Sequence, residues 1–384
     1  MTVPSSYQAT RTRGASILGR EISRRDLLRG LGTVGLATLG TVACGQVSSN
    51  PSTGGSGAGK KLQLTMFVFL GGDLGVMPRE FIAEWQESHP NVEITMYEES
   101  NQVGYPKMLS RAETDPDNPL VNFGFFNAQT TEQGIVDQMW TELDYSAMSN
   151  ATQIRPAMQR GDRVGIGIGA DQLGLVHNTE EMPQATDSWS QLWNPANDSM
   201  VTFFGFPWYA VYMAAQLNGG SLTDMEPGWQ VWQQRAQNIR TLVTSNPQYL
   251  NVLASGTAPL TAYFNGTAHQ WVRDGAPLTY VPPAEGAVSL PVHLQSVRHQ
   301  SEQAQEACQE IINEMISPKW CARWAETSIE VPANAEAVLP PEMASLPAFS
   351  QETVEALINP DYAVVGQQLT AWTDRWERDV VSGI

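Results

Sequence analysis

The chain has few basic residues for its length, with 22 Lys and Arg against 40 Asp and Glu. Residues 1–43 hold six arginines and only two acidic residues, so the remainder carries a net charge of about −22. Nucleic-acid phosphates require a basic surface, and this balance therefore excludes a nucleic-acid partner. It fits a cationic solute only weakly, because acidic surfaces also serve solubility.

Long hydrophobic runs are also missing. The run from Leu31 to Val42 is about a dozen residues, whereas a helix needs roughly 20 to cross a bilayer. It follows Ser23-Arg24-Arg25-Asp26-Leu27-Leu28-Arg29, and a basic segment before a short apolar run predicts an export signal. The arginine pair resembles a twin-arginine signal. A surface arginine pair beside a buried helix is the alternative.

A cleavage-like segment, Thr41-Val42-Ala43-Cys44-Gly45, follows the apolar run and resembles a lipoprotein box with Cys44 as the lipidated residue. Thr41 stands where Leu is usual, so cleavage near Ala43 without lipidation stays an alternative. Residues 44–61 are rich in Gly and Ser, which predicts a flexible tether. We therefore expect a lipid-anchored protein in the periplasm or on the outer face of the cytoplasmic membrane.

Signatures of catalysis are lacking as well. The sequence contains no H-E-x-x-H, G-x-S-x-G or P-loop motif, and Gly165–Gly169 lacks the spacing of a dinucleotide fingerprint. We expect no enzyme activity, no cofactor and no metal site. Besides Cys44, the cysteines are Cys308 and Cys321. They predict either a disulfide, which an oxidising compartment permits, or two separately buried thiols.

What is present is a regular alternation of strand and helix patterns. Leu62–Val68 and Asn91–Met96 predict strands around a helix that contains Phe81 and Trp85, which is a βαβ unit with a parallel sheet. Gly228–Thr244 predicts a longer helix. Such alternation favours an α/β fold, and about 320 residues after the tether are enough for two lobes.

Several spaced segments resemble the spermidine/putrescine-type periplasmic solute-binding proteins of ABC importers. The similar segments are Tyr97–Asn101, Leu173–Asn178, the S-W-x-x-L-W-x-P stretch from Ser188 to Pro195, Phe264–Ala268, Tyr280–Gly286, Ala307–Pro318 and Pro332–Ala337. Together they run from about Leu62 to Trp376. Their order and spacing carry the resemblance, because each segment alone is weak.

The resemblance implies a two-lobed periplasmic-binding-protein fold, each lobe a mainly parallel sheet flanked by helices, with the ligand cleft at the hinge. Lobe 1 would comprise residues 62–168 and 283–335, and lobe 2 residues 169–282 and 336–384. The implied function is capture of a polyamine-like solute, spermidine, putrescine or a related cation, for delivery to an ABC permease in the cytoplasmic membrane. We expect a monomer. The alternative is a solute-binding fold re-used as an interaction or sensor lipoprotein.

The resemblance also implies where the ligand would bind. Desolvated ammonium groups need carboxylates or aromatic faces. The loop Gly205–Tyr209 lacks the Asp and Glu that polyamine binders show there. An alternative is therefore an aromatic cleft that binds a quaternary ammonium or a ligand whose charge needs no carboxylate partner. The candidate ligand-binding residues are Asp73, Asn127, Gln129, Phe206, Trp208, Tyr209, Phe264, Asn265 and His293.

Overall fold

The computed structural model describes residues 61–70, 73–184 and 187–384. The predicted export signal, Cys44 and the tether up to residue 60 lie outside these ranges. Within them, no helix has the length and apolar character to cross a membrane.

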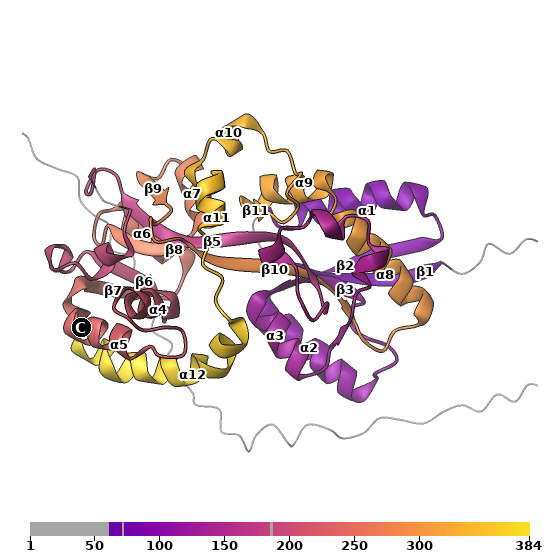
Figure 1. Cartoon of the computed structure of the whole chain (residues 1–384), viewed down its shortest axis with the longest axis horizontal. Helices are drawn as coiled ribbons and strands as arrows, with labels where there is room; N and C mark the ends of the chain where they lie inside the picture. The colour runs from indigo at the N-terminus through magenta and orange to yellow at the C-terminus, as the bar shows by residue number, and fades with distance from the viewer. Residues whose placement is uncertain (1–60, 71–72, 185–186) are drawn as a thin grey trace, which may run out of the picture. The chain divides into compact units, whose positions relative to one another are not determined.

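One mixed sheet of eleven strands connects the described chain (Figure 1). Its strands are β1 (Leu62–Phe69), β2 (Val92–Glu99), β3 (Phe123–Asn127), β4 (Trp140–Thr141), β5 (Ile166–Asn178), β6 (Val201–Phe204), β7 (Ile239–Val243), β8 (Leu260–Phe264), β9 (Leu278–Val281), β10 (Val288–Val297) and β11 (Val331–Pro332). The main path has the order β2-β1-β3-β10-β5-β8-β6-β7.

Helices surround this sheet. They are α1 (Val76–Ser88), α2 (Asn101–Thr114), α3 (Ala128–Val136), α4 (Trp208–Leu217), α5 (Glu226–Gln234), α6 (Asn246–Ala254), α7 (Asn265–Arg273), α8 (Glu302–Met315), α9 (Pro318–Ser328), α10 (Pro341–Ala344), α11 (Gln351–Glu355) and α12 (Tyr362–Asp379). Short 3₁₀ turns connect several of them. The α/β class is confirmed.

The two ends of the sheet are parallel and its middle is antiparallel. At one end β1 pairs with β2 in parallel from Leu62↔Val92 to Phe69↔Glu99, which confirms the predicted βαβ unit. At the other end β6 pairs in parallel with β7 and β8. Between them, β5 and β10 run antiparallel.

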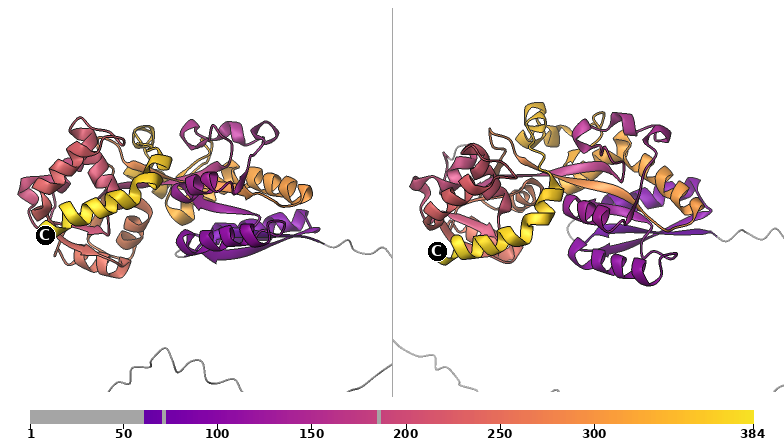
Figure 2. Two further views of the ribbon diagram at one scale, coloured as in Figure 1. Left: turned by 90° about the horizontal axis from the view of Figure 1, so that it is seen from below. Right: turned by 60° about the horizontal axis from the view of Figure 1, so that its bottom comes forward.

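The described residues form four hydrophobic cores, and the two largest lie on either side of this middle. The larger one packs α1, α8 and α9 against β1, β3 and the first part of β5, and we call this part lobe 1. The other packs α4, α5 and α12 against β6, β8 and the later part of β5, and we call it lobe 2. Strands β5 and β10 pass from one part into the other, as Figure 2 shows from two further sides.

One local structure differs from the sequence prediction. Gly228–Thr244 is not one helix, because α5 ends at Gln234 and β7 begins at Ile239. The segment Ile239–Val243, in which three of five residues are β-branched, pairs with β6, so sheet pairing overrides the helical periodicity.

Candidate functional site

A cavity of about 650 Å³ lies where lobe 1, lobe 2 and the connecting strands meet. Lobe 1 contributes the end of β1 and the first turns of α2 and α3. Lobe 2 contributes the end of β8 and one face of α12. The middle of β5, the start of β10 and the residue before β11 complete the lining.

The lobe 1 wall is polar and built from side-chain amides. Asn101 and Gln102 begin α2, and Asn127, Gln129 and Gln133 lie at or near the start of α3. Asn127 caps α3, since its side-chain oxygen accepts the Thr130 N–H at 2.9 Å. The amino-terminal ends of two helices therefore face the cavity, and these ends favour groups that accept hydrogen bonds.

The opposite wall is apolar. Phe264 ends β8, Leu290 and Pro291 belong to β10, and Leu369 comes from α12. Phe69, at the end of β1, adds a second aromatic ring on the lobe 1 side. Such a surface suits the methylene chain of an organic solute.

Two carboxyl groups lie between these walls. Asp171 is in β5, and Glu330 directly precedes β11. They are the only Asp, Glu, Lys or Arg residues among the described residues that line the cavity. A cavity with two acids and no base favours a cation.

Burial has a strong effect on both carboxyl groups. Desolvation raises the pKa of Asp171 to about 7, although the Gln172 and Gly266 backbone N–H groups donate to its Oδ1 at 2.7 and 3.2 Å. Desolvation, followed by the nearby Asp171, raises the pKa of Glu330 well above its ordinary value. Trp324 opposes this rise by donating its indole N–H to Glu330 Oε2 at 2.7 Å.

Three of the sequence-predicted site residues, Asn127, Gln129 and Phe264, line this cavity. Asn265 lies directly behind it as the first residue of α7, fully buried, and its Nδ2 donates to the Ile329 carbonyl at 2.7 Å. This bond ties α7 to the segment that carries Glu330.

Three other candidates lie in the core of lobe 2. Trp208 and Tyr209 are buried in α4, and Tyr209 donates its hydroxyl to the Ala262 carbonyl at 3.1 Å. Phe206 packs against Trp229 and Trp376, with ring centroids 6.1 and 5.7 Å away. None of the three is among the residues that line the cavity. The structure therefore does not assemble the four aromatic candidates into one cage.

The last two candidates are also elsewhere. His293 is buried in β10, with Nδ1 3.3 Å from the Thr131 hydroxyl, and burial lowers its pKa to about 3. Asp73 is exposed, and its carboxylate lies 3.9 Å from the Arg273 guanidinium. Neither lines the cavity.

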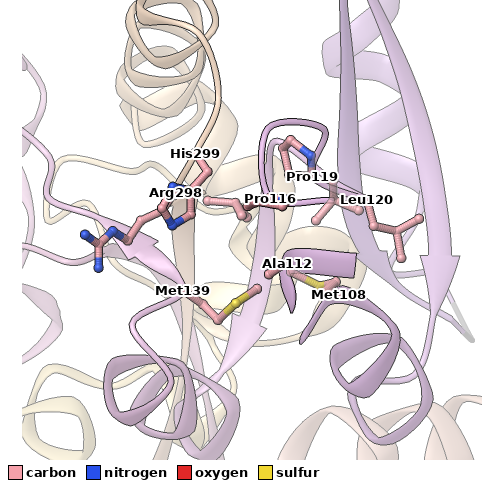
Figure 3. A pocket seen from close by; sticks show the side chains of 10 residues that line it. Met108, Ala112, Pro116, Pro119, Leu120, Met139, Arg298 and His299 are labelled. Atoms are coloured by element: carbon pink, nitrogen blue, oxygen red, sulfur yellow. The ribbon is translucent and has the colours of Figure 1, made fainter. Parts of the chain in front are cut away.

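A smaller hollow lies near α2, between Met108, Met139 and His299 (Figure 3). It offers only about 10 Å³ of free space and has no room for an organic solute. Within the described ranges there is no group of three or more His, Cys, Asp or Glu residues that could hold a metal ion. We take the cavity between the lobes as the candidate site, because both lobes and three of the sequence-predicted residues line it.

Sequence reasoning missed Asp171 and Glu330. The available signal was one acidic residue within the apolar run from Ile166 to Val176, where a charge is costly unless it has a role. Glu330 gave no comparable signal, because its burial depends on the turn after α9.

The model of the bacterial extracellular solute-binding protein family matches residues 80–351, well over half of the chain. The chain belongs to this family. The chain is therefore an extracellular solute-binding protein and not an enzyme.

Solved structures share the fold at low sequence identity. An ABC transporter protein of Clostridium perfringens is 17% identical, with a TM-score of 0.70 over 83% of this chain and 100% of the other. The spermidine/putrescine substrate-binding protein of Streptococcus pneumoniae is 18% identical, with a TM-score of 0.69 over 83% and 98%. A GABA receptor is 16% identical, with a TM-score of 0.66 over 83% and 96%. No curated protein matches the sequence. The periplasmic-binding-protein fold is thereby confirmed.

Proposed function

We propose that this family member captures a small organic cation of the polyamine-like class in the cavity between the lobes and delivers it to its permease. The supporting observation is a pair of carboxyl groups, the half-buried Asp171 and the buried Glu330, in a cavity whose described lining has no basic residue. A desolvated ammonium would be balanced there by opposite charge. The apolar wall with Phe264 would cover a methylene chain.

Two of the structural neighbours are named for amines, and a third was solved with agropinic acid. One neighbour is named for spermidine and putrescine and another for GABA, and each of these molecules carries at least one amino group. At 16 to 18% identity these names do not transfer a ligand, so the proposal rests on the carboxyl groups of this chain.

Capture would couple to motion of the lobes. β5 and β10 are the long connections between the two cores, and α12 of lobe 2 contributes Gly366 and Leu369 to a cavity that α3 of lobe 1 also lines. A ligand that contacts both lobes would favour a closed arrangement through a hinge at these strands.

We further propose that the protein is exported through its twin-arginine-like segment, anchored through a lipid on Cys44, and active as a monomer. Globomycin, which blocks lipoprotein signal cleavage, and a Cys44→Ser variant would test the anchor. Globomycin should leave the uncleaved precursor in the membrane fraction, whereas Cys44→Ser should abolish the acylated form because the thiol that carries the lipid is gone. Unchanged processing and membrane association in both experiments would contradict the anchor.

The ligand class is tested by thermal unfolding of the chain without its signal, against polyamines, other amines, betaines, amino acids and ferric ion. A ligand at 100-fold over its dissociation constant stabilises the folded state by about 2.7 kcal/mol, which raises the melting temperature by several degrees. We expect that only the solutes with an amino group raise the melting temperature. Shifts with uncharged or anionic solutes alone would contradict the proposal. No shift with any solute would favour the interaction or sensor lipoprotein.

A further inference from the structure

The two carboxyl groups of the cavity occupy facing positions on adjacent strands. β11 pairs with β5 in antiparallel register, with Val331 opposite Ala170 and Pro332 opposite Gly169. The next position in this register sets Glu330 opposite Asp171. Directly opposed residues of an antiparallel pair point to the same face, and like charges there destabilise the pair. The fold has therefore placed two acids where only one charge is readily accommodated.

The surrounding structure holds both groups in place. Glu330 is 6% exposed, and it follows Ile329, whose left-handed φ of 57° turns the chain at the end of α9. Such a conformation is costly for a β-branched residue and is found where the surrounding structure enforces it. Asn265 fixes this turn through its bond to the Ile329 carbonyl.

Two oxygens of the pair accept no hydrogen bond from the described residues. Trp324 donates to Oε2 of Glu330, which leaves Oε1, and the N–H groups of Gln172 and Gly266 both donate to Oδ1 of Asp171, which leaves Oδ2. Glu330 nevertheless lines the cavity although it is more than nine-tenths buried. A buried carboxyl group with a free oxygen at a cavity wall has the geometry of a ligand-binding group.

We infer that Asp171 and Glu330 share one proton in the empty cavity and exchange it for a single ammonium group of the ligand. The proton leaves to solvent, and the ammonium takes its place between two ionised carboxylates. This inference rests on the proposed function and narrows it to a solute with one positive charge.

The rest of the lining opposes a second positive charge. The far wall presents the amides of Asn101, Asn127 and Gln129 and the amino-terminal ends of α2 and α3. Helix amino-terminal ends carry partial positive charge and repel cations. The other end of the ligand should therefore be a hydrogen-bond acceptor, such as a hydroxyl or a carboxylate, and not a second ammonium.

The groups that face the pair do not take part in the exchange. Tyr263 in β8 and Tyr280 in β9 have a raised pKa because of burial and the nearby Asp171, so both stay neutral. His269 in α7 has a lowered pKa because of burial. Several charges on neighbouring helices form ion pairs of their own: Arg323 in α9 with Glu80 and Glu326, Lys107 in α2 with Glu99, Glu132 in α3 with Arg160, and Arg375 in α12 with Glu226 and Asp379. None of these residues lines the cavity.

The test uses ligands that differ at one end only. Calorimetry of the chain without its signal would compare 4-aminobutan-1-ol, 4-aminobutyrate and putrescine. All three have a four-carbon chain with an ammonium at one end, and only putrescine has a second ammonium at the other end. At pH 8 we expect one of the first two to bind at least about 10-fold more tightly than putrescine, since a second ammonium would lie at the helix ends. Putrescine binding as tightly as both would overturn the single-ammonium inference.

Proton exchange is measured in the same titrations, in two buffers without primary amines that differ in ionisation enthalpy. At pH 8 the wild type should release about one proton per ligand. Glu330→Gln should still bind but release almost none, because Asp171 alone is already ionised above pH 7. Binding by the wild type without proton release would overturn the exchange.

Two further variants complete the design. Asp171→Asn should weaken binding at least about 30-fold, because it removes one of the two carboxylates and leaves only Glu330, whose ionisation burial opposes. Glu377→Gln removes an acidic group from an exposed position of α12 and should bind like the wild type. Equal affinity of Asp171→Asn and wild type would overturn the inference while leaving amine capture intact, whereas a wild type that binds no amine refutes the proposed function itself.

Discussion

The backbone N–H of Gly266 donates to Asp171 Oδ1 at 3.2 Å and so joins the amino-terminal end of α7 to the strand that connects the two lobes. On its other side, Gly266 packs against the backbone of Ser328, at the end of α9. A helix end that donates to a carboxylate stabilises its charged form. Here it does so next to Glu330, in a place where burial favours the neutral form.

Gly266→Ala should disturb this arrangement. A Cβ at residue 266 would lie 2.5 Å from the Ser328 carbonyl oxygen, so the backbone of α7 or of Ser328 has to move, whereas its 3.5 Å distance from Asp171 Oδ2 is an ordinary contact. We expect a loss of about 1–3 kcal/mol in the free energy of unfolding and weaker ligand binding. Urea unfolding and calorimetry measure the two effects.

Gly366→Ala is the matched control for that substitution. Gly366 is in α12 at the cavity, and a Cβ there would meet no atom within 4 Å. Replacing an unstrained helical glycine should stabilise the protein by about 0.5–1 kcal/mol. If both variants lose stability equally, the close approach at Gly266 is not the cause.

The two cysteines of the described chain should behave as unreactive thiols. Cys308 and Cys321 are free and fully buried, and burial raises the pKa of each thiol to about 12. Thiolate is the reactive form, so neither should react with a disulfide reagent in the native protein at pH 8. Both should react after unfolding in urea without reductant. Failure of the unfolded chain to react would indicate a disulfide in the isolated protein.

The architecture could be predicted from sequence because its signals are local. The βαβ unit at β1, α1 and β2 depends on alternation and helical periodicity within a few tens of residues. The resemblance to polyamine-type binding proteins, spread over many segments, gave the fold and the family. The helix predicted over Gly228–Thr244 is wrong because the partner of β7 is β6, more than 30 residues earlier in the chain.

The candidate site could be predicted only in part. Asn127 and Phe264 each end a strand directly before a helix, which is a position that sequence patterns identify. Asp171 and Glu330 are 159 residues apart and meet only through the register of β5 and β11. Trp208 and Tyr209 are residue types that can bind a cation, but both are buried in α4, in the core of lobe 2. Which aromatic residues face a cavity is decided by tertiary packing.

The contrast between Phe264 and Phe206 can be tested directly. Phe264 lines the cavity, whereas Phe206 packs against Trp229 and Trp376 in lobe 2. Phe264→Leu should weaken binding of the amine that gives the largest thermal shift by about 3- to 10-fold, because the aromatic face is lost. Phe206→Leu should lower the free energy of unfolding by about 1–2 kcal/mol and leave affinity unchanged. The opposite pattern would place Phe206 in the ligand site.

The stability of the ligand-free protein should depend on pH through Asp171. Burial raises its pKa from 3.8 to about 7 in the folded state, so the folded protein holds this proton more tightly than the unfolded chain. The protonated form is therefore the one compatible with folding, and stability is lost as the pH rises from about 4 through 7. Relative to wild type, Asp171→Asn should gain stability over this range, by at most about 4 kcal/mol at pH 8.

Urea unfolding of both proteins at several pH values measures this difference. Subtracting one curve from the other removes the contribution of His177, His269 and His293, whose pKa values are lowered by burial and which destabilise both proteins at acidic pH. The two proteins should differ least near pH 4 and most above pH 7, where wild-type Asp171 is ionised without a ligand cation. A constant difference across this range would mean that Asp171 does not change its ionisation in the empty cavity between pH 4 and pH 8, which would contradict its raised pKa.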